Sequence, residues 1–182
     1  MKIAHIPEDR LTNGVALQAS IQDNLIVDRY FKKPIKKNLF MDYTKVEEIT
    51  NGLIEQYSIK TPSGKLLLSS LSGGNMQKVV VARELSSEPY VLIAAQPTRG
   101  IDVGATEFIR EQLVANRTQG TAILLVSADL SEVMSLSDRI ITLFEGKVTG
   151  VFPDASQATE EELGTYMLGL KSQTYEEMEA YL

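Results

Sequence analysis

The residues best suited to chemistry in this sequence form a glycine-rich turn before an apolar-periodic segment. Leu71–Lys78 reads Leu-Ser-Gly-Gly-Asn-Met-Gln-Lys. Two glycines let a backbone approach a phosphate closely, and Ser72 offers a hydroxyl group. The helix that follows directs its N-terminal amides at the anion, which contributes only about 0.3–1 kcal/mol. The turn therefore predicts half of a phosphate site, with a serine-capped helix after a Gly-Gly turn as the alternative.

Composition restricts the chemistry that the rest of the chain can support. The 182 residues contain no cysteine and one histidine, so we expect no disulfide, no thiolate metal site, no histidine-based zinc cluster and no serine-histidine triad. The formal net charge is −6, and lysines group only at residues 32–37, which indicates a solvated turn and no nucleic-acid partner. The apolar runs are far shorter than the roughly 20 residues of a membrane span, and no secretory signal pattern is seen. We therefore expect a cytoplasmic protein.

Short apolar runs alternate with helical periodicity and predict an α/β fold. Residues 3–6, 90–95, 121–127 and 139–144 predict strands, and the apolar character of the last three predicts burial on both faces. Residues 103–116 predict a helix between two of these strands, and this order predicts right-handed crossovers and a parallel sheet. His5 lies in the first strand and is expected to be structural.

Helical patterns and turn signals surround this core. Residues 23–25 and 44–57 predict helices, and Glu145–Gly146 predicts a hairpin. Thr159 and Glu162 predict a capping box for a last helix through residue 170. The predicted segments are a first core strand with its loop at 1–19, a helical subdomain at 20–70, a signature helix with the later part of the core at 71–170, and a mobile tail at 171–182.

The glycine-rich turn resembles the signature motif of ABC-type ATPases. Asn75 resembles the variant found in sugar and nucleoside importers, and Pro7–Arg10 and Pro97–Ala105 are the most specific further marks. The resemblance covers nearly all of the chain, but the chain corresponds only to the C-terminal part of the second nucleotide-binding domain in a tandem subunit. It implies an α/β fold, an incomplete P-loop NTPase (RecA-like) parallel sheet with a helical subdomain.

Carried over residue by residue, the resemblance implies a nucleotide-binding edge. The residues expected to bind the nucleotide are Ser72, Gly73, Gly74, Gln77, Asp102 and Glu8. Asp102 stands at the D-loop, which contacts the facing domain, and helix capping is its alternative. Glu8 stands where the family's Q-loop has glutamine, and a surface salt bridge with Arg10 is its alternative.

The catalytic edge departs from the family. Ala95 and Gln96 replace the Walker B aspartate and the catalytic glutamate, and Ala128 replaces the switch histidine. Alanine cannot coordinate magnesium, and a neutral amide cannot accept a proton from water, a step typically contributing about 10² to 10⁴ in rate. No catalytic residue is intact, although Gln96 can still position a water or a phosphate oxygen.

The largest departure is the absence of a phosphate-binding loop. Only Gly64–Lys65 and Gly146–Lys147 offer a Gly-Lys pair, and neither has the upstream glycine or the following hydroxyl residue of the motif. In the family this loop follows a strand between those matching 123–126 and 140–144. We expect its loss to leave two apolar strand edges at a gap that is closed by direct pairing, a neighbouring chain or disorder.

Two functional hypotheses follow. The first is a partial ATP-binding domain of an importer that couples ATP binding and hydrolysis to sugar or nucleoside uptake, and that contributes its signature motif to a partner domain's ATP site. ATP and magnesium then bind in the complete subunit and not to this chain alone, which is expected to be inactive. Its partners are the other nucleotide-binding domain and permease subunits at the inner face of the cell membrane. The second is a non-catalytic interaction module that docks on an ABC partner.

Overall fold

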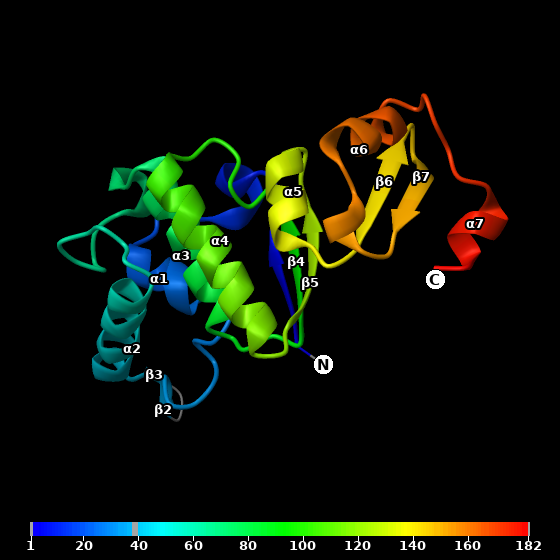
Figure 1. Ribbon diagram of the computed structural model, residues 1–182. Helices are drawn as coiled ribbons and strands as arrows, with labels where there is room; N and C mark the ends of the chain where they lie inside the picture. The colour runs from blue at the N-terminus through cyan, green and yellow to red at the C-terminus, as the bar shows by residue number, and fades with distance from the viewer. Residues whose placement is uncertain (1, 38–39, 182) are drawn as a thin grey trace. The chain divides into compact units, whose positions relative to one another are not determined.

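The structure is a computed structural model that describes residues 2–37 and 40–181. The chain divides into two units, Met1–Val126 and Ser127–Leu182, each with its own sheet. This division differs from the segments predicted from the sequence, whose boundaries stay a prediction. Figure 1 follows the first unit from blue to yellow-green and the second from yellow to red.

Three parallel strands form the sheet of the first unit. They are β1 (Ile3–Ile6), β4 (Val91–Ala95) and β5 (Ala122–Val126), in the order β1-β4-β5. The register aligns Ile3 with Val91 and Val91 with Ala122. The α/β class and the parallel sheet predicted from alternating apolar runs are therefore confirmed.

Two helices cover one face of this sheet. Helix α3 (Gly73–Leu85) contacts β1, helix α4 (Val103–Thr118) contacts β5, and the two helices pack against each other (Figure 1). Helix α4 begins where the Asp102 carboxylate accepts a hydrogen bond from the Ala105 amide at 2.9 Å. It buries Ala105, Ile109 and Leu113 at helical spacing, as the sequence predicts.

The opposite face of the sheet is open, which corrects the prediction that these strands are buried on both faces. Ile3, Leu124 and Val126 are 62%, 57% and 50% exposed, whereas Leu92 and Ala94 beneath the helices are fully buried. No helix of the first unit packs on this face in the described residues. Apolar composition alone could not distinguish a strand covered twice from one covered once.

A helical segment lies between β1 and α3. It contains the π-helical turn η1 (Arg10–Gly14), α1 (Ile21–Ile26), the short strand pair β2 (Lys36–Lys37) and β3 (Phe40–Met41), α2 (Tyr43–Gln56) and the 3-10 turn η2 (Leu68–Ser70). Ile26, Ile35 and Val46 form its small apolar core. The two predicted helices are confirmed. No helix in the part of the chain that the structure describes is long and apolar enough to cross a membrane.

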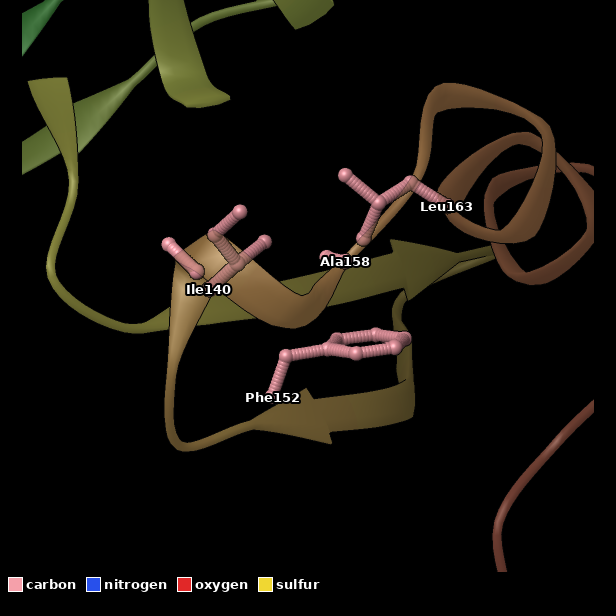
Figure 2. Packing of buried hydrophobic residues seen from close by; sticks show 5 residues of the cluster. Ile140, Phe152, Ala158 and Leu163 are labelled. Atoms are coloured by element: carbon pink, nitrogen blue, oxygen red, sulfur yellow. The ribbon is translucent and has the colours of Figure 1, made fainter. Parts of the chain in front are cut away.

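The second unit is built on a hairpin. It comprises α5 (Leu130–Leu136), β6 (Ile140–Phe144), β7 (Lys147–Phe152), the 3-10 turn η3 (Ala155–Gln157), α6 (Glu160–Met167) and α7 (Tyr175–Glu179). The antiparallel pairing of β6 with β7 confirms the predicted hairpin. Figure 2 shows Ile140, Phe152, Ala158 and Leu163 gathered between the hairpin and α6 as the core of this unit.

The end of the chain differs from the prediction. Thr159 caps α6 by accepting a hydrogen bond from the Glu162 amide at 3.2 Å, but α6 ends at Met167 and is followed by Gly169 at φ +69°. The last helix is α7, inside the predicted mobile tail. Gln173 attaches this tail to β7, because its backbone amide donates a hydrogen bond to the Thr149 carbonyl at 2.8 Å.

The predicted closure of the gap between the strands at 123–126 and 140–144 stays a prediction. Among the described residues, β5 pairs with β4 within the first unit, and β6 pairs with β7 within the second.

Leu163 tests whether the second unit has a core of its own. Leu163→Ala should lower the free energy of unfolding by about 2–5 kcal/mol, because the side chain is fully buried and its loss leaves a cavity. Urea unfolding measures this change. The control Leu168→Ala removes a side chain that is 65% exposed and should have little effect. Equal losses in the two variants would contradict this core.

Candidate functional site

The candidate site begins at the glycine turn, which we define as Ser72–Asn75. Ser72 is exposed and caps α3, with its hydroxyl accepting hydrogen bonds from the Asn75 backbone amide at 3.4 Å and from the Asn75 side-chain amide at 2.9 Å. No acidic residue lies in the first turn of the helix. The positive end of the helix dipole therefore meets no carboxylate within its own first turn.

Gly74 allows α3 to approach the beginning of α4. A Cβ atom at this position would lie 2.5 Å from Asp102 Oδ2 and 2.9 Å from the Ala105 Cβ. Gly73 has more room, since its Cβ would meet the flexible end of the Arg10 side chain at 3.0 Å and the Gly100 carbonyl oxygen at 3.7 Å. The absence of a side chain at Gly74 is thus required by the packing of two helices. The Asp102 carboxylate is held at this contact while it caps α4.

Gln77 joins the signature helix to the loop at residues 96–102. Its Nε2 donates a hydrogen bond to the Pro97 carbonyl at 2.7 Å, and the residue is only 2% exposed. The family resemblance implied that Gln77 binds the nucleotide. In the structure the side-chain amide of Gln77 is buried, and its hydrogen bond fixes the position of the loop that contains Asp102.

Arg10 holds the same loop from the other side. Its Nη1 donates to the Arg99 carbonyl at 2.9 Å, and its Nη2 donates to the Gly100 carbonyl at 3.2 Å. Gly100 has φ +68°, a conformation that suits glycine. The surface salt bridge considered between Glu8 and Arg10 is not formed, because Glu8 pairs with Arg99. Sequence spacing gave no signal for these contacts, which join segments 89 and 90 residues apart.

Asp9 holds the turn that carries Arg10. Its carboxylate accepts hydrogen bonds from the Thr12 hydroxyl at 2.7 Å and from the backbone amides of Leu11 and Thr12. The Thr12 hydroxyl is the largest cause of a pKa of Asp9 below the ordinary value of 3.8. An ionised Asp9 therefore favours the geometry that presents Arg10 to the loop.

Two side chains of α3 tie it to the helical segment, and the sequence analysis missed both. Asn75 Oδ1 accepts a hydrogen bond from the Lys60 amide at 2.8 Å, and Lys78 Nζ donates to the Ser58 carbonyl at 3.1 Å. Lys78 Nζ also lies 4.3 Å from the centre of the Phe108 ring. Burial, with a smaller contribution from Lys60, lowers the pKa of Lys78. The glycine turn is therefore anchored to the helical segment and to α4.

A hollow of about 590 Å³ lies along β1 and the loop that follows it, and reaches Ala95 at the carboxyl end of β4. Its lining residues are Ile3, His5, Pro7, Glu8, Asp9, Asn13, Arg83, Glu84 and Ala95. Glu8, predicted to bind the nucleotide, and Ala95, predicted at the degenerate catalytic positions, both line this hollow. His5 was expected to be structural, but its side chain is exposed and lines this hollow.

The residues at this edge do not fit a magnesium ion. Ala95 contributes no oxygen from its side chain, and Gln96 contributes a neutral amide at a strained φ of +47°. Within residues 2–37 and 40–181, no three His, Asp or Glu side chains are grouped as metal ligands. Ala128 is exposed and belongs to the second unit. We derive no catalytic step through a metal in this chain.

Import ATP-binding proteins are similar to this chain over most of its length. Over 167 residues it is 38% identical to the nucleoside import protein NupA of Lactococcus lactis, 41% to the guanosine import protein NupO of Bacillus subtilis and 37% to the ribose import protein RbsA of Shouchella clausii. These matches cover 92% of this chain, which spans only about a third of the relatives' length. No family model matches the chain.

Solved structures give the fold. The ATP-binding cassette MJ0796, in a dimeric post-hydrolysis state bound to ADP and Pi, superposes with a TM-score of 0.67 at 22% identity. The match covers 82% of this chain and 62% of the cassette. A second structure of MJ0796, described as a bacterial ABC transporter cassette, gives a TM-score of 0.66. The chain therefore has the fold of an ABC cassette, a P-loop NTPase fold, over part of that cassette's length.

Substitution at Gly74 tests the close packing of the site. Gly74→Ala should lower the free energy of unfolding by about 1–3 kcal/mol, because the new methyl group overlaps Asp102 and Ala105. The matched control Gly52→Ala lies in α2, where a Cβ meets nothing within 4 Å, and should raise stability by about 0.5–1 kcal/mol. Thermal or urea unfolding measures both changes. A stabilised Gly74→Ala variant would show that the packing is looser than described.

The hydrogen bond between Thr12 and Asp9 predicts a pH dependence. Thr12→Val should raise the pKa of Asp9 toward its ordinary value of 3.8, as measured by an NMR titration of the carboxyl carbon. The stabilisation from Asp9 is present above that ordinary value and is lost as the pH falls through the lower folded-state pKa. The variant should therefore have a smaller loss of stability over this acidic range. Thr118→Val, whose hydroxyl donates to the Val114 carbonyl, is the control and should leave the pKa of Asp9 unchanged.

Proposed function

We propose that this chain, a homologue of part of the ATP-binding subunits of ABC importers for nucleosides and sugars, supplies the signature half of an ATP site that another nucleotide-binding domain completes. The observation that carries the proposal is the glycine turn. It is a helix N-terminus with an exposed Ser72 cap and the Arg10 guanidinium beside Gly73, in a sequence without a phosphate-loop motif. Such a turn stabilises a phosphate only together with other ligands.

The contacts around the turn support this role. Gln77 and Arg10 hold the loop that carries Asp102, and Gly74 brings that carboxylate against the start of α3. In the proposed site Ser72, Gly73 and Gly74 face the terminal phosphate, Asp102 contacts the facing domain, and Gln77 acts through the loop that it holds. A preorganised turn of this kind needs little rearrangement when the nucleotide binds.

The catalytic groups of that site belong to the other domain. Ala95, Gln96 and Ala128 cannot supply a magnesium ligand or a general base, so this chain's own edge faces a weaker site, in which Glu8 can still approach the nucleotide. We assign ATP and magnesium to the complete subunit and not to this chain alone. When they bind there, the metal neutralises phosphate charge and the ATP provides the energy for transport.

The biological role proposed for the complete assembly is uptake of a nucleoside or a sugar. The names of the relatives, which include nucleoside, guanosine and ribose import proteins, support this solute class. The partners proposed are a second nucleotide-binding domain and transmembrane permease subunits. This assembly would hold the chain on the cytoplasmic side of the membrane.

A chimera tests the proposal. The stretch of the guanosine import protein of B. subtilis that matches this chain is replaced by this chain, and ATP hydrolysis is measured in the purified chimera. Ser72→Asp should lower the rate at least about a hundredfold, because the new carboxylate repels the phosphate of ATP. Loss of a single hydrogen-bond donor to the transition state can lower a rate by about this factor. Ser72→Asn is the matched control, since both residues are good helix caps and only aspartate adds charge.

A substitution at the catalytic edge, where Gln96 stands in place of the family's glutamate, gives the second comparison. Gln96→Ala should leave the rate close to that of the parent chimera, because this residue is placed at the weaker site. Melting temperatures confirm that each variant is folded. A large loss in Gln96→Ala with none in Ser72→Asp would reverse the assignment of the two edges and refute the proposal.

A further inference from the structure

The two segments that mark this sequence most specifically, Pro7–Arg10 and Pro97–Ala105, meet through Arg10. Arg10 Nη1 donates a hydrogen bond to the Arg99 carbonyl at 2.9 Å, and Nη2 donates to the Gly100 carbonyl at 3.2 Å. A guanidinium group presents its donors in a rigid planar fork, so bonds to two successive carbonyls fix its orientation. The same bonds hold the backbone of the second segment against the first.

The Arg10 side chain also reaches the glycine turn. A Cβ atom at Gly73 would lie 3.0 Å from Arg10 Nη2 and 3.7 Å from the Gly100 carbonyl oxygen. At the other end of the side chain, a Cβ atom at Gly14 would lie 3.3 Å from Arg10 Cβ and 3.5 Å from Val80 Cγ2. The arginine therefore extends along α3, from beside Val80 to the first residue of the helix. One side chain contacts both the turn and the loop that follows β4.

Two buried polar atoms at this contact are not explained by the stability of the fold. Arg10 Nε and Gln77 Oε1 are both buried, and neither has a hydrogen-bond partner within residues 2–37 and 40–181. A buried polar atom without a partner destabilises a fold. Both residues bond backbone carbonyls of the loop at 96–102 with their other polar atoms. Positions at which a fold retains such unfavourable atoms are expected to be functional ones.

We propose that Arg10 is a positioning residue of the signature half-site, which sets the distance between the glycine turn and the loop at 96–102. This inference rests on the proposed function. Ser72 and Asp102 lie on these two different elements, and a group that contacts both elements determines how the two side chains face the nucleotide of the other domain. A displacement of about 1 Å in such a site can lower a rate about a hundredfold. Arg10 acts through the turn and the loop and needs no contact with ATP.

Hydrogen exchange in the purified 182-residue chain tests the positioning without a nucleotide. Arg10→Lys keeps the positive charge, but an ammonium group does not reproduce the planar fork. Exchange of the backbone amides at residues 72–76 and 99–106 should become at least about tenfold faster, because local opening of these segments then requires less free energy. Arg29→Lys is the matched control, since Arg29 also donates to two backbone carbonyls, at the C-terminal end of α3. The control should leave exchange in both segments unchanged.

Kinetics of the chimera with the guanosine import protein provide the second readout. Arg10→Lys should lower kcat for ATP hydrolysis at least about tenfold and change KM little, because the other nucleotide-binding domain still holds the phosphates while the signature half-site is misplaced. A role in folding alone would not separate kcat from KM in this way. Arg29→Lys should leave kcat close to that of the parent chimera, and melting temperatures show that both variants are folded.

The outcomes separate this inference from the proposed function. Unchanged exchange in Arg10→Lys, a kcat equal to that of the parent chimera, or equal effects of Arg10→Lys and Arg29→Lys would overturn the positioning role while Ser72→Asp still abolishes most of the hydrolysis. If Ser72→Asp leaves hydrolysis unchanged, the proposed function itself is refuted, and with it the site that Arg10 is proposed to position.

Discussion

The close approach of α3 to the start of α4 at Gly74 is the contact on which the candidate site depends. It leaves no space for a side chain between the glycine turn and the Asp102 carboxylate. The same carboxylate caps α4, so the two helices and the loop at 96–102 are fixed by one small region. Gln77 and Arg10 then bond the carbonyls of that loop. The position of the proposed phosphate-binding turn is therefore a consequence of helix packing.

The close packing of this region contrasts with the residues beside it, which do not fit a magnesium ion. The hollow along β1 is lined by Glu8, Asp9 and Ala95, and the neutral amide of Gln96 follows Ala95 in the chain. These residues do not form the set of oxygen ligands that magnesium requires. A fold can keep its packing after its catalytic residues are lost, because the packing depends on buried contacts and the chemistry depends on a few polar side chains. This separation favours a role in which the chain contributes structure to a site and another domain contributes reactive groups.

One face of the first unit's sheet is uncovered. Parallel sheets are normally covered on both faces, and here α3 and α4 cover only one. The chain spans 62% of the solved cassette that it resembles, and about a third of its import relatives. The apolar side chains of Leu124 and Val126 in β5 are therefore exposed on the uncovered face.

Local sequence patterns were sufficient for much of the fold. The strands of the parallel sheet, helix α4, the hairpin and the absence of a phosphate-binding loop all follow from neighbouring residues, since periodicity and turn chemistry act over a few positions. The sequence also shows directly that alanine and glutamine, and no carboxylate, stand at positions 95 and 96.

Only the tertiary structure decided how these elements are used. The hydrogen bonds of Arg10 and the burial of Gln77 depend on segments far apart in the chain, and no local pattern encodes them. Exposure of Leu124 depends on which elements cover the sheet, and apolar composition is the same for a covered and an open strand. The sequence by itself determined the residues of the glycine turn, and the packing around Gly74 determined where they are held.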